Sequence, residues 1–475
     1  MMKRKPKIVT PNQPVNYKNI AESIHIVQKL SKVSYVTIDK ADSAYHLMLA
    51  SLTKGNREYV LSIDEPASYR FQLGYIKDMG ISTPDFNLVA EKVFANHISE
   101  GKIIARIDKF HSEEFKPKAQ YFYRLIIPYK ERLDFFFNIE HIGYRTAGRS
   151  SASCLRASYK NLTVDLYTYD DREQNVNFLI LDASATLTFD GFLEYCFSTL
   201  VSYGYLTGVM PQDEGYFFAY EASEMRTPKA FQFSQLRPTM RSEYSPIYAN
   251  AFGYMHGIAK HDEIDKVHKS LRTLTLDEFS IICQWAHSSL EFSSILLLVI
   301  EACSSSLLVM PSGFSVALEG LTDLIVSENE DKVAPIKDKT VARKIRSDMN
   351  TVVNNYASDL TTEGVKILKA RIENLNSLTN QSKLIKPFEL LKFKLTEEDR
   401  RVINHRNNFL HGRLTLSLGK EVANKEIYYI SLRLYTLIAV LVLKYVGFDN
   451  KIVNYPMIFD SVYRKNLNED YFRQL

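Results

Sequence analysis

Cysteine is scarce in this chain of 475 residues: there are four, and no two of them form a C-x-x-C pair. This scarcity argues against a zinc ribbon and against the disulfide framework of a small secreted domain. The basic stretch Met1–Pro6 is followed by no apolar segment, so we expect no signal peptide. The apolar runs 295–300 and 438–443 are far shorter than the roughly 20 residues of a membrane-spanning helix, and they predict buried helices. We therefore expect a cytoplasmic protein with no membrane partner.

A large excess of charge is also missing, because 59 Lys and Arg residues face 55 Asp and Glu residues, a net charge of +4. Binding to a nucleic acid would thus depend on local basic clusters. The sequence contains no G-x-x-x-x-G-K-S/T, G-x-G-x-x-G, H-E-x-x-H or G-x-S-x-G motif. These absences disfavour nucleotide hydrolases, dinucleotide enzymes, zinc proteases and α/β-hydrolases. We predict no metal and no other cofactor.

Aromatic residues are abundant, with 29 Tyr and 27 Phe but one Trp, and they concentrate in the first half of the chain. They fall in short runs typical of strands, at 102–108, 120–127, 133–139, 162–169 and 176–181. One helix interrupts these runs, with Asp190 as its expected N-cap and Gly204 as its expected stop. Another helix is expected over Tyr17–Leu30. Residues from about 100 to about 240 predict an antiparallel sheet.

A polar stretch at 256–275 separates the strand-rich half from a half with helical periodicity. The expected helices span 279–303, 313–326, 341–356, 362–378, 396–411 and 424–446. The sequence thus predicts an α+β protein, in which a β-rich recognition or sensor domain at 1–270 precedes an all-α domain at 276–475. A division of the first domain into subdomains 1–95 and 96–260 stays open.

One helix carries the most informative pattern. Thr396 and Asp399 have the spacing of a capping box, which predicts a helix over 397–411. Its apolar residues form one face, and Arg406 falls in the middle of that face. An unpaired cation there would cost several kcal/mol, so Arg406 must meet an anion or line a cleft. His411 lies about 140° around the helix from Arg406, so one straight helix does not point both at one spot.

The segment Arg406-Asn-x-x-x-His411 matches the R-x(4–6)-H signature of HEPN-domain ribonucleases, including the polar residue that often follows the Arg. Gly412 and the all-helical setting near the C-terminus resemble the ApeA-like branch found in bacterial anti-phage proteins. The resemblance covers about residues 276–450 and leaves the first 270 residues unassigned. It implies a helical bundle that dimerises so that two motifs meet in one cleft and cut RNA without a metal. Two copies would also bring together the side chains that one helix separates.

The same R-x4-H spacing occurs two more times in the chain. Arg106 and His111 lie in a strand-like segment, whereas Arg400 and His405 overlap the better match but place Arg400 on the polar face of the helix. The pair that begins at Arg406 is the one that combines an apolar-face Arg with an adjacent Asn and a following Gly. The spacing alone is therefore weak, and its context is what favours a nuclease.

On this interpretation, the ribose 2′-OH of RNA attacks the adjacent phosphorus. His411 handles the hydroxyl proton, because His titrates near neutral pH. Arg406 holds the phosphate, because its planar fork matches phosphate oxygens, and Asn407 orients one of the two. The alternative is structural, with Arg406 buried against an acid and His411 a polar residue at a helix end.

Two further groups of residues are candidates for support of this site. Glu301 follows an apolar run and is expected to be buried, while Glu319 lies in an Ala-Leu-Glu element that resembles one of ApeA-like proteins. Either carboxylate could position Arg406. A basic cluster supplies the RNA-binding candidates, although such runs are more often solvated helix faces. These candidates are Lys337, Lys339, Arg343, Lys344 and Arg346.

Two functions of different classes follow. The first is a metal-independent endoribonuclease, an anti-phage abortive-infection effector that acts as a homodimer through its helical domain, with tRNA as one candidate substrate. By the resemblance, its N-terminal domain would respond to a phage-derived trigger. The second is a non-catalytic binding protein, in which the helical domain mediates dimerisation and the aromatic sheet recognises a ligand.

Overall fold

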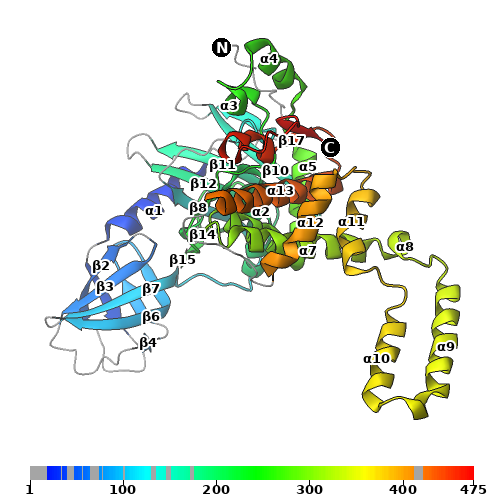
Figure 1. The fold of residues 1–475 in the computed structure, drawn as a ribbon. Coiled ribbons are helices and arrows are strands. Elements are labelled where there is room, and N and C mark those ends of the chain that lie inside the picture. Colours follow the sequence, from blue (N-terminus) through cyan, green and yellow to red (C-terminus); the bar gives the residue numbers. More distant parts are fainter. Residues whose placement is uncertain are drawn as a thin grey trace. The chain divides into compact units, whose positions relative to one another are not determined.

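A computed structural model gives the structure of the protein. It describes residues 19–33, 35–39, 48–55, 57–64, 74–76, 79–99, 102–129, 135–145, 151–171, 176–410 and 421–475. An antiparallel β-sheet region is followed by a helical region, which confirms the α+β class (Figure 1). Contacts divide the chain into a sheet unit, Met1–Ala251 with Asp265–Ser293, and a helical unit, Phe252–Ile264 with Ser294–Leu475. The chain therefore divides at other places than the single break that we predicted near residue 270.

Within the described residues of the sheet unit, fourteen strands form one hydrogen-bonded sheet in the order β4-β6-β5-β1-β2-β3-β7-β15-β14-β8-β12-β11-β10-β9. The first seven are β1 (Tyr35–Asp39), β2 (Met48–Lys54), β3 (Tyr59–Asp64), β4 (Gly74–Ile76), β5 (Met79–Ser82), β6 (Asn87–Ser99) and β7 (Lys102–Ser112). The others are β8 (Phe122–Tyr129), β9 (Ile142–Arg145), β10 (Ser151–Tyr159), β11 (Leu162–Asp171), β12 (Val176–Ala183), β14 (Glu214–Tyr220) and β15 (Ala230–Gln235). A short pair is formed by β13 (Val209–Met210) and β16 (Met240–Arg241).

An additional pairing of β6 with β7 closes β6-β5-β1-β2-β3-β7 into a ring of strands. Strand β7 also pairs with β15, so it belongs both to this ring and to the open part of the sheet. The ring spans residues on both sides of position 95. The sheet thus joins the two segments that the sequence left open as subdomains 1–95 and 96–260.

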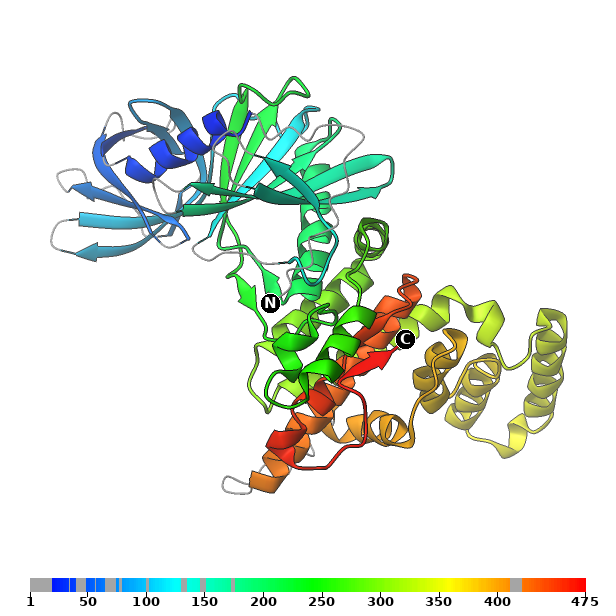
Figure 2. The same cartoon turned by 90° about the horizontal axis from the view of Figure 1, so that it is seen from above.

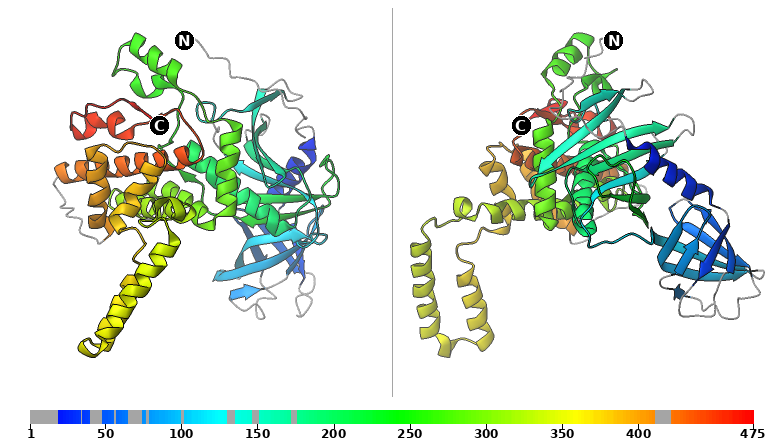
Figure 3. Two further views of the ribbon diagram at one scale, coloured as in Figure 1. Left: turned by 90° about the vertical axis from the view of Figure 1, so that its right-hand side faces the viewer. Right: turned by 180° about the vertical axis from the view of Figure 1, so that it is seen from behind.

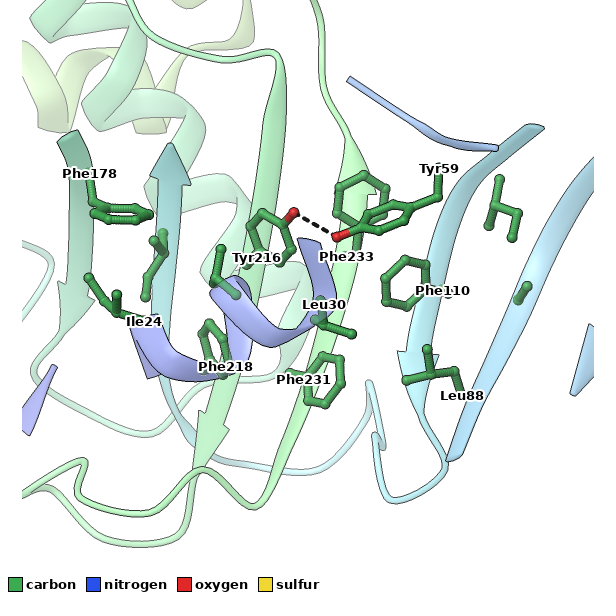
Figure 4. Close-up of a cluster of buried hydrophobic side chains, with 14 of the residues drawn as sticks. Ile24, Leu30, Tyr59, Leu88, Phe110, Phe178, Tyr216, Phe218, Phe231 and Phe233 are labelled. Carbon is green, nitrogen blue, oxygen red and sulfur yellow. Dashed lines mark hydrogen bonds between the residues drawn. The ribbon is translucent and has the colours of Figure 1, made fainter. Parts of the chain in front are cut away.

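Helix α1 (Ala21–Lys32) covers one face of the sheet and fills its aromatic core. Figure 4 shows its residues Ile24 and Leu30 among strand side chains that include Phe218 and Phe231. This packing follows from the alternation of the strands, which turns every second aromatic side chain to the same face. The exposed fractions of these four side chains are 4% or less, so the core under α1 is shielded from water.

A buried ion pair holds the strands under α1 in place. Arg124 of β8 is 0% exposed, and its Nε and Nη2 donate to the two carboxylate oxygens of Asp182 at 2.7 and 2.8 Å. Its Nη1 donates to the carbonyl oxygen of Asn19 at 2.9 Å. The hydroxyl of Tyr167 donates to the same carboxylate at 2.6 Å. All these groups find partners, as buried polar groups must if they are not to destabilise the fold.

The strands predicted at 102–108, 162–169 and 176–181 are confirmed as parts of β7, β11 and β12. The prediction of a strand over 133–139 was wrong for the described residues 135–139, because the residues after Phe135 form a turn. The buried amide of Asn138 donates to the carbonyl oxygens of Leu206 and Ile247, at 3.0 and 2.6 Å. These tertiary hydrogen bonds replace the strand ladder that the aromatic run suggested.

The helix predicted between the strands, with Asp190 and Gly204 as its ends, is α2 (Phe189–Thr207). It is one turn longer than expected at its C-terminal end. Its N-cap is Thr188, not Asp190, because the Thr188 hydroxyl accepts a hydrogen bond from the Gly191 N–H. Gly208, not Gly204, ends the helix with a φ of 79°. That left-handed conformation suits glycine, which has no Cβ to clash.

The second half of the chain is helical, and Figures 2 and 3 show its elements from three further directions. The helices are α3 (Ala251–Met255), α4 (His261–Ser270), α5 (Leu276–Ser288), α6 (Leu290–Cys303), α7 (Met310–Glu328), α8 (Glu330–Val333), α9 (Lys339–Asn355), α10 (Thr362–Glu373), α11 (Asn380–Leu390), α12 (Glu397–Leu410), α13 (Glu421–Tyr445), α14 (Tyr455–Ile458) and α15 (Asp460–Tyr463). Strands β17 (Lys451–Val453) and β18 (Phe472–Gln474) pair near the C-terminus.

The centre of the helical unit is α13, which packs against α7, α12, α14 and α15. Its apolar run Ile438–Leu443 is 0 or 1% exposed, as predicted for a buried helix. Within the described ranges, α13 is the one single helix long and apolar enough to cross a membrane, but nearly all of its apolar stretch is buried in the protein. It therefore has the character of a core helix.

Two predictions for the helical half need correction, and one helix was missed. The helix expected over 279–303 is two helices, because Ser289 is extended and its hydroxyl accepts the N–H of Phe292 to begin α6. The first of them, α5, packs against α2 and β10 and so belongs to the sheet unit. The polar stretch 256–275 contains α4, and α11 was not predicted at all. Helix α11 contains Pro387, a residue that disfavours a helix interior and so weakens the sequence signal for this helix.

Candidate functional site

The candidate site is built on α12, and its first turn forms as the sequence predicted. The Thr396 N–H donates to the Asp399 carboxylate at 2.9 Å, and the Asp399 N–H donates to the Thr396 hydroxyl at 3.1 Å. This capping box satisfies two backbone donors that a helix start leaves open. Val402 and Ile403 are 0% exposed, so the predicted apolar face is buried.

Asp399 also anchors α12 to the C-terminal part of the helical unit. It is 0% exposed and accepts hydrogen bonds from Arg473, whose Nη1 lies 3.0 Å from Oδ1. The Nη1 of Arg433, on α13, lies 3.5 Å from the same oxygen. Burial alone would raise the pKa of Asp399, but the hydrogen bonds and charges of the two arginines outweigh it and lower that pKa. The start of α12 is thus tied to two other elements.

Arg406 lies on the buried face of α12, as the helical wheel predicted, and is 5% exposed. Its Nη2 is 3.8 Å from Oε1 of Glu319, which comes from α7. Burial lowers the pKa of the Arg406 guanidinium, and the charges of Glu319 and Asp323 oppose that shift without cancelling it. Glu319 and Asp323 are thus the acids whose charge acts on the Arg406 guanidinium.

Helix α7 presents two acids toward this corner of the helical unit. Glu319 and Asp323 lie four residues apart, which places them on one face of the helix. Their side chains are 43% and 45% exposed. Asp323 pairs with Lys383 of α11, at 3.5 Å between Oδ1 and Nζ. Sequence reasoning missed Asp323 and its pairing, although the four-residue spacing of the two acids was a usable signal.

The far end of α12 is held against α7 as well. The hydroxyl of Ser312, in the first turn of α7, donates to the carbonyl oxygen of Phe409 at 3.4 Å. Phe409 itself is 4% exposed. Helix α12 is therefore fixed at both ends, by Asp399 at its start and by α7 near its end. That rigidity is what a side chain such as Arg406 needs if it is to hold a ligand in a defined position.

Of the other predicted catalytic residues, His411 lies outside the described residues, as does Gly412. Asn407 lies within α12, but its side chain also falls outside the described part of the chain. Arg406 is therefore the predicted catalytic residue whose side chain the structure describes.

The prediction that Glu301 is buried was wrong, because its side chain is exposed on α6. Helix α6 is not apolar all round. Exposed Glu291, Ser294 and Glu301, with half-buried Leu298 between them, recur at helical spacing and form a solvent-facing stripe. Of the two acids that could position Arg406, the structure brings Glu319 close to it.

The predicted basic cluster lies in and just before α9. Lys339 pairs with Asp331 at 2.7 Å, and Arg346 with Glu373 of α10 at 3.7 Å. Lys337, Arg343 and Lys344 are exposed. The cluster is thus a surface feature of a helix, as a basic run most often is.

Scans of the chain against family models, curated proteins and solved structures find no match. The resemblance to HEPN ribonucleases consequently depends on the pattern of α12 and its setting.

Proposed function

We propose that the protein is a metal-independent endoribonuclease of the HEPN type, in which Arg406 binds the scissile phosphate. The observation that carries this proposal is the environment of Arg406, a 5% exposed guanidinium on the apolar face of α12 with the half-exposed carboxylate of Glu319 3.8 Å away. A buried cation whose acidic neighbour remains open to solvent is suited to receive a second anion. The oxygens of a phosphate match its planar fork.

The reaction needs a proton acceptor and a group that stabilises the charge on phosphorus. The 2′-OH of a ribose attacks the adjacent phosphorus, the bond to the 5′ oxygen of the next nucleotide breaks, and a 2′,3′-cyclic phosphate remains. His411 takes the hydroxyl proton or returns one to the leaving oxygen. Arg406 stabilises the charge on the phosphorane oxygens, and Asn407 orients one of these two side chains.

Glu319 acts as a positioning residue for Arg406 in this scheme. Its carboxylate keeps the guanidinium on one side of α12 when no RNA is bound, and Asp323, paired with Lys383, adds negative charge along the same face of α7. A carboxylate that is 43% exposed loses little hydration when a phosphate takes over part of its role.

The proposal extends to the setting of the reaction. Two copies of the helical unit form the active nuclease, so that Arg406 of one copy and His411 of the other contribute to one cleft. The sheet unit restrains this activity until it binds a trigger of phage origin, and the protein acts in the cytoplasm on RNA, of which tRNA is one candidate. The large aromatic sheet supports a recognition role, because a nuclease centre alone has no need of it.

The decisive experiment incubates the full chain with total RNA in EDTA and analyses the new RNA ends. We expect cleavage that leaves 2′,3′-cyclic phosphates and that falls at least about 100-fold in His411→Ala. The matched control is His405→Ala, a change on the same helix at an exposed residue of the overlapping R-x4-H pattern, which should leave cleavage unchanged.

Cleavage that persists in a well-folded His411→Ala variant would remove that residue from the mechanism. The absence of cleavage with and without candidate triggers, such as lysate of infected cells, would favour the alternative of a non-catalytic binding protein.

A further inference from the structure

Helices α9 and α10 pack against each other as an antiparallel hairpin, and Figures 1 and 3 show this hairpin standing away from the other helices of the helical unit. We call residues 336–376 the arm. Its base is closed by a reciprocal contact, in which the side-chain amide of Asn376 accepts the N–H of Ile336 at 2.7 Å and donates to its carbonyl oxygen at 3.0 Å. At the start of α9, the Asp338 carboxylate accepts the N–H groups of Thr340 and Val341. These hydrogen bonds fix where the arm begins and ends.

One face of the arm gathers cations from both of its helices. The pair Arg346–Glu373, at 3.7 Å, marks where α9 and α10 meet on that face. Arg343 lies three residues before Arg346, and Lys369 lies four residues before Glu373, so each occupies the same row of its helix. Lys339 and Lys366 continue these rows, since each lies seven residues before one member of the pair. We call Lys339, Arg343, Arg346, Lys366 and Lys369 the cationic face.

The cationic face is open to solvent and has few acids to neutralise it. Arg343, Lys366 and Lys369 are exposed, and none of the three forms an ion pair within the described ranges. Hydrogen bonding and charge from Asp331 raise the pKa of Lys339, and the nearby charge of Arg343 opposes that shift. Arg343 thus adds to the positive potential around Lys339 instead of being neutralised by a carboxylate.

The face is also long enough to follow a polymer. From the Arg346–Glu373 pair, Lys339 lies seven residues along α9 in one direction, and Lys366 lies seven residues along α10 in the other. At 1.5 Å per residue, the cations span roughly 20 Å in a line. A line of cations on a firmly based hairpin complements a chain of phosphates, which carries negative charge at regular intervals.

We propose that the cationic face of the arm binds the phosphate backbone of RNA outside the cleavage site. This inference rests on the proposed function and adds to it the surface that holds the substrate. Lys344 and Arg371 do not take part. Each lies two residues from a member of the Arg346–Glu373 pair, which places it about 160° around its helix from the cationic face.

The experiment compares two double variants of the full chain that remove the same charge from the same helices. Arg343→Ala with Lys369→Ala removes one Arg and one Lys from the cationic face, whereas Lys344→Ala with Arg371→Ala removes one Lys and one Arg from the other sides of the arm. Binding to a fluorescent 30-nucleotide single-stranded RNA is measured by anisotropy over a range of salt concentrations. A His411→Ala background prevents cleavage during the measurement.

We expect the first pair to weaken binding roughly tenfold at about 0.1 M salt and to reduce the slope of log Kd against log salt by about 1.4, since each lost contact with single-stranded RNA contributes about 0.7. The second pair should change both values much less. Equal losses for the two pairs would mean that net charge alone matters and would overturn the proposal, as would no loss for the first pair. A parallel cleavage assay distinguishes the RNA-binding role of the arm from the nuclease activity. Cleavage without a selective loss of binding would support the nuclease and contradict the role of the arm. A selective loss of binding without cleavage would support the role of the arm and contradict the nuclease.

Discussion

Arg124 in the sheet unit and Arg406 in the helical unit are both buried, but they differ in how they pair with a carboxylate. Arg124 in the sheet unit is 0% exposed, and a buried carboxylate, that of Asp182, accepts hydrogen bonds from its fork at 2.7 and 2.8 Å. Arg406 in the helical unit is 5% exposed, but the carboxylate of Glu319 lies 3.8 Å away and is 43% exposed. A distance of 3.8 Å is beyond hydrogen-bonding range.

The pKa values of the two guanidinium groups move in opposite directions. Burial lowers the pKa of Arg124, but Asp182 outweighs it and leaves that pKa well above its usual value. For Arg406, burial prevails over Glu319 and Asp323, and the pKa is lowered. Arg124 thus belongs to a buried, hydrogen-bonded ion pair, whereas the pair of Arg406 with Glu319 is longer and its carboxylate is half-exposed. Substitutions at the two positions should separate stability from activity.

The largest effect on stability is expected for Arg124→Ala. This change leaves the Asp182 carboxylate buried without its counter-ion, so the free energy of unfolding should fall by about 3 to 5 kcal/mol in denaturant titrations. Lys109→Ala is the control in the same unit, because its pair with Glu91 is about one-third exposed and should contribute less than about 1 kcal/mol. The double variant Arg124→Met with Asp182→Leu should recover part of the loss. A small loss for Arg124→Ala would show that the ion pair does not hold the sheet together.

Arg406→Ala should instead have a large effect on activity and a small effect on stability. Under the proposed function Arg406 stabilises the phosphorane, so its loss should reduce RNA cleavage by about 100- to 1000-fold, while the free energy of unfolding falls by only about 1 to 2 kcal/mol. The matched control is Arg400→Ala, on the exposed side of the same helix, which should alter neither quantity. A variant that loses as much stability as Arg124→Ala and unfolds would make Arg406 a structural residue too.

The smallest effect concerns pH and the anchor of α12. Because the pKa of Asp399 is lowered in the folded state, the anchor is fully present above the unfolded pKa of about 3.9 and is lost as pH falls through the lower folded value. Glu398 behaves alike, since hydrogen bonds from Arg401 lower its pKa to about 2. Unfolding of the chain should therefore become easier as pH drops from about 4 toward 2. The decline should be shallower in Asp399→Asn, and equal slopes would contradict the assignment.

The local part of the site could be predicted from the sequence, because it depends on residues a few positions apart. The capping box of Thr396 and Asp399, and the burial of Arg406, both follow from spacing within one helix. The acid beside Arg406 could not be singled out in this way. Glu319 and Glu301 were equal candidates, and the packing of α7 on α12 is what brings Glu319 close to Arg406.

The sheet teaches the same lesson at a larger scale. Alternating residues identified β7, β11 and β12, but the pairing of β6 with β7 and of β7 with β15 joins strands whose order no periodicity encodes. The run after Phe135 has the composition of a strand and is nevertheless a turn, because Asn138 bonds to backbone groups far along the chain. Tertiary hydrogen bonds of this kind override local preference.

The assignment of α5 to the sheet unit has a consequence for how the protein can be cut and recombined. The backbone passes from one unit to the other after Ala251, after Ile264 and again after Ser293. The two units are therefore connected by three chain segments and not by a single linker. A fragment that starts at residue 276 would carry α5 away from β10 and α2 and would expose Phe279 and Ile282, both 0% exposed in the intact chain. A gene fusion that exchanges one half for another at a single junction would therefore leave at least one of the two units incomplete.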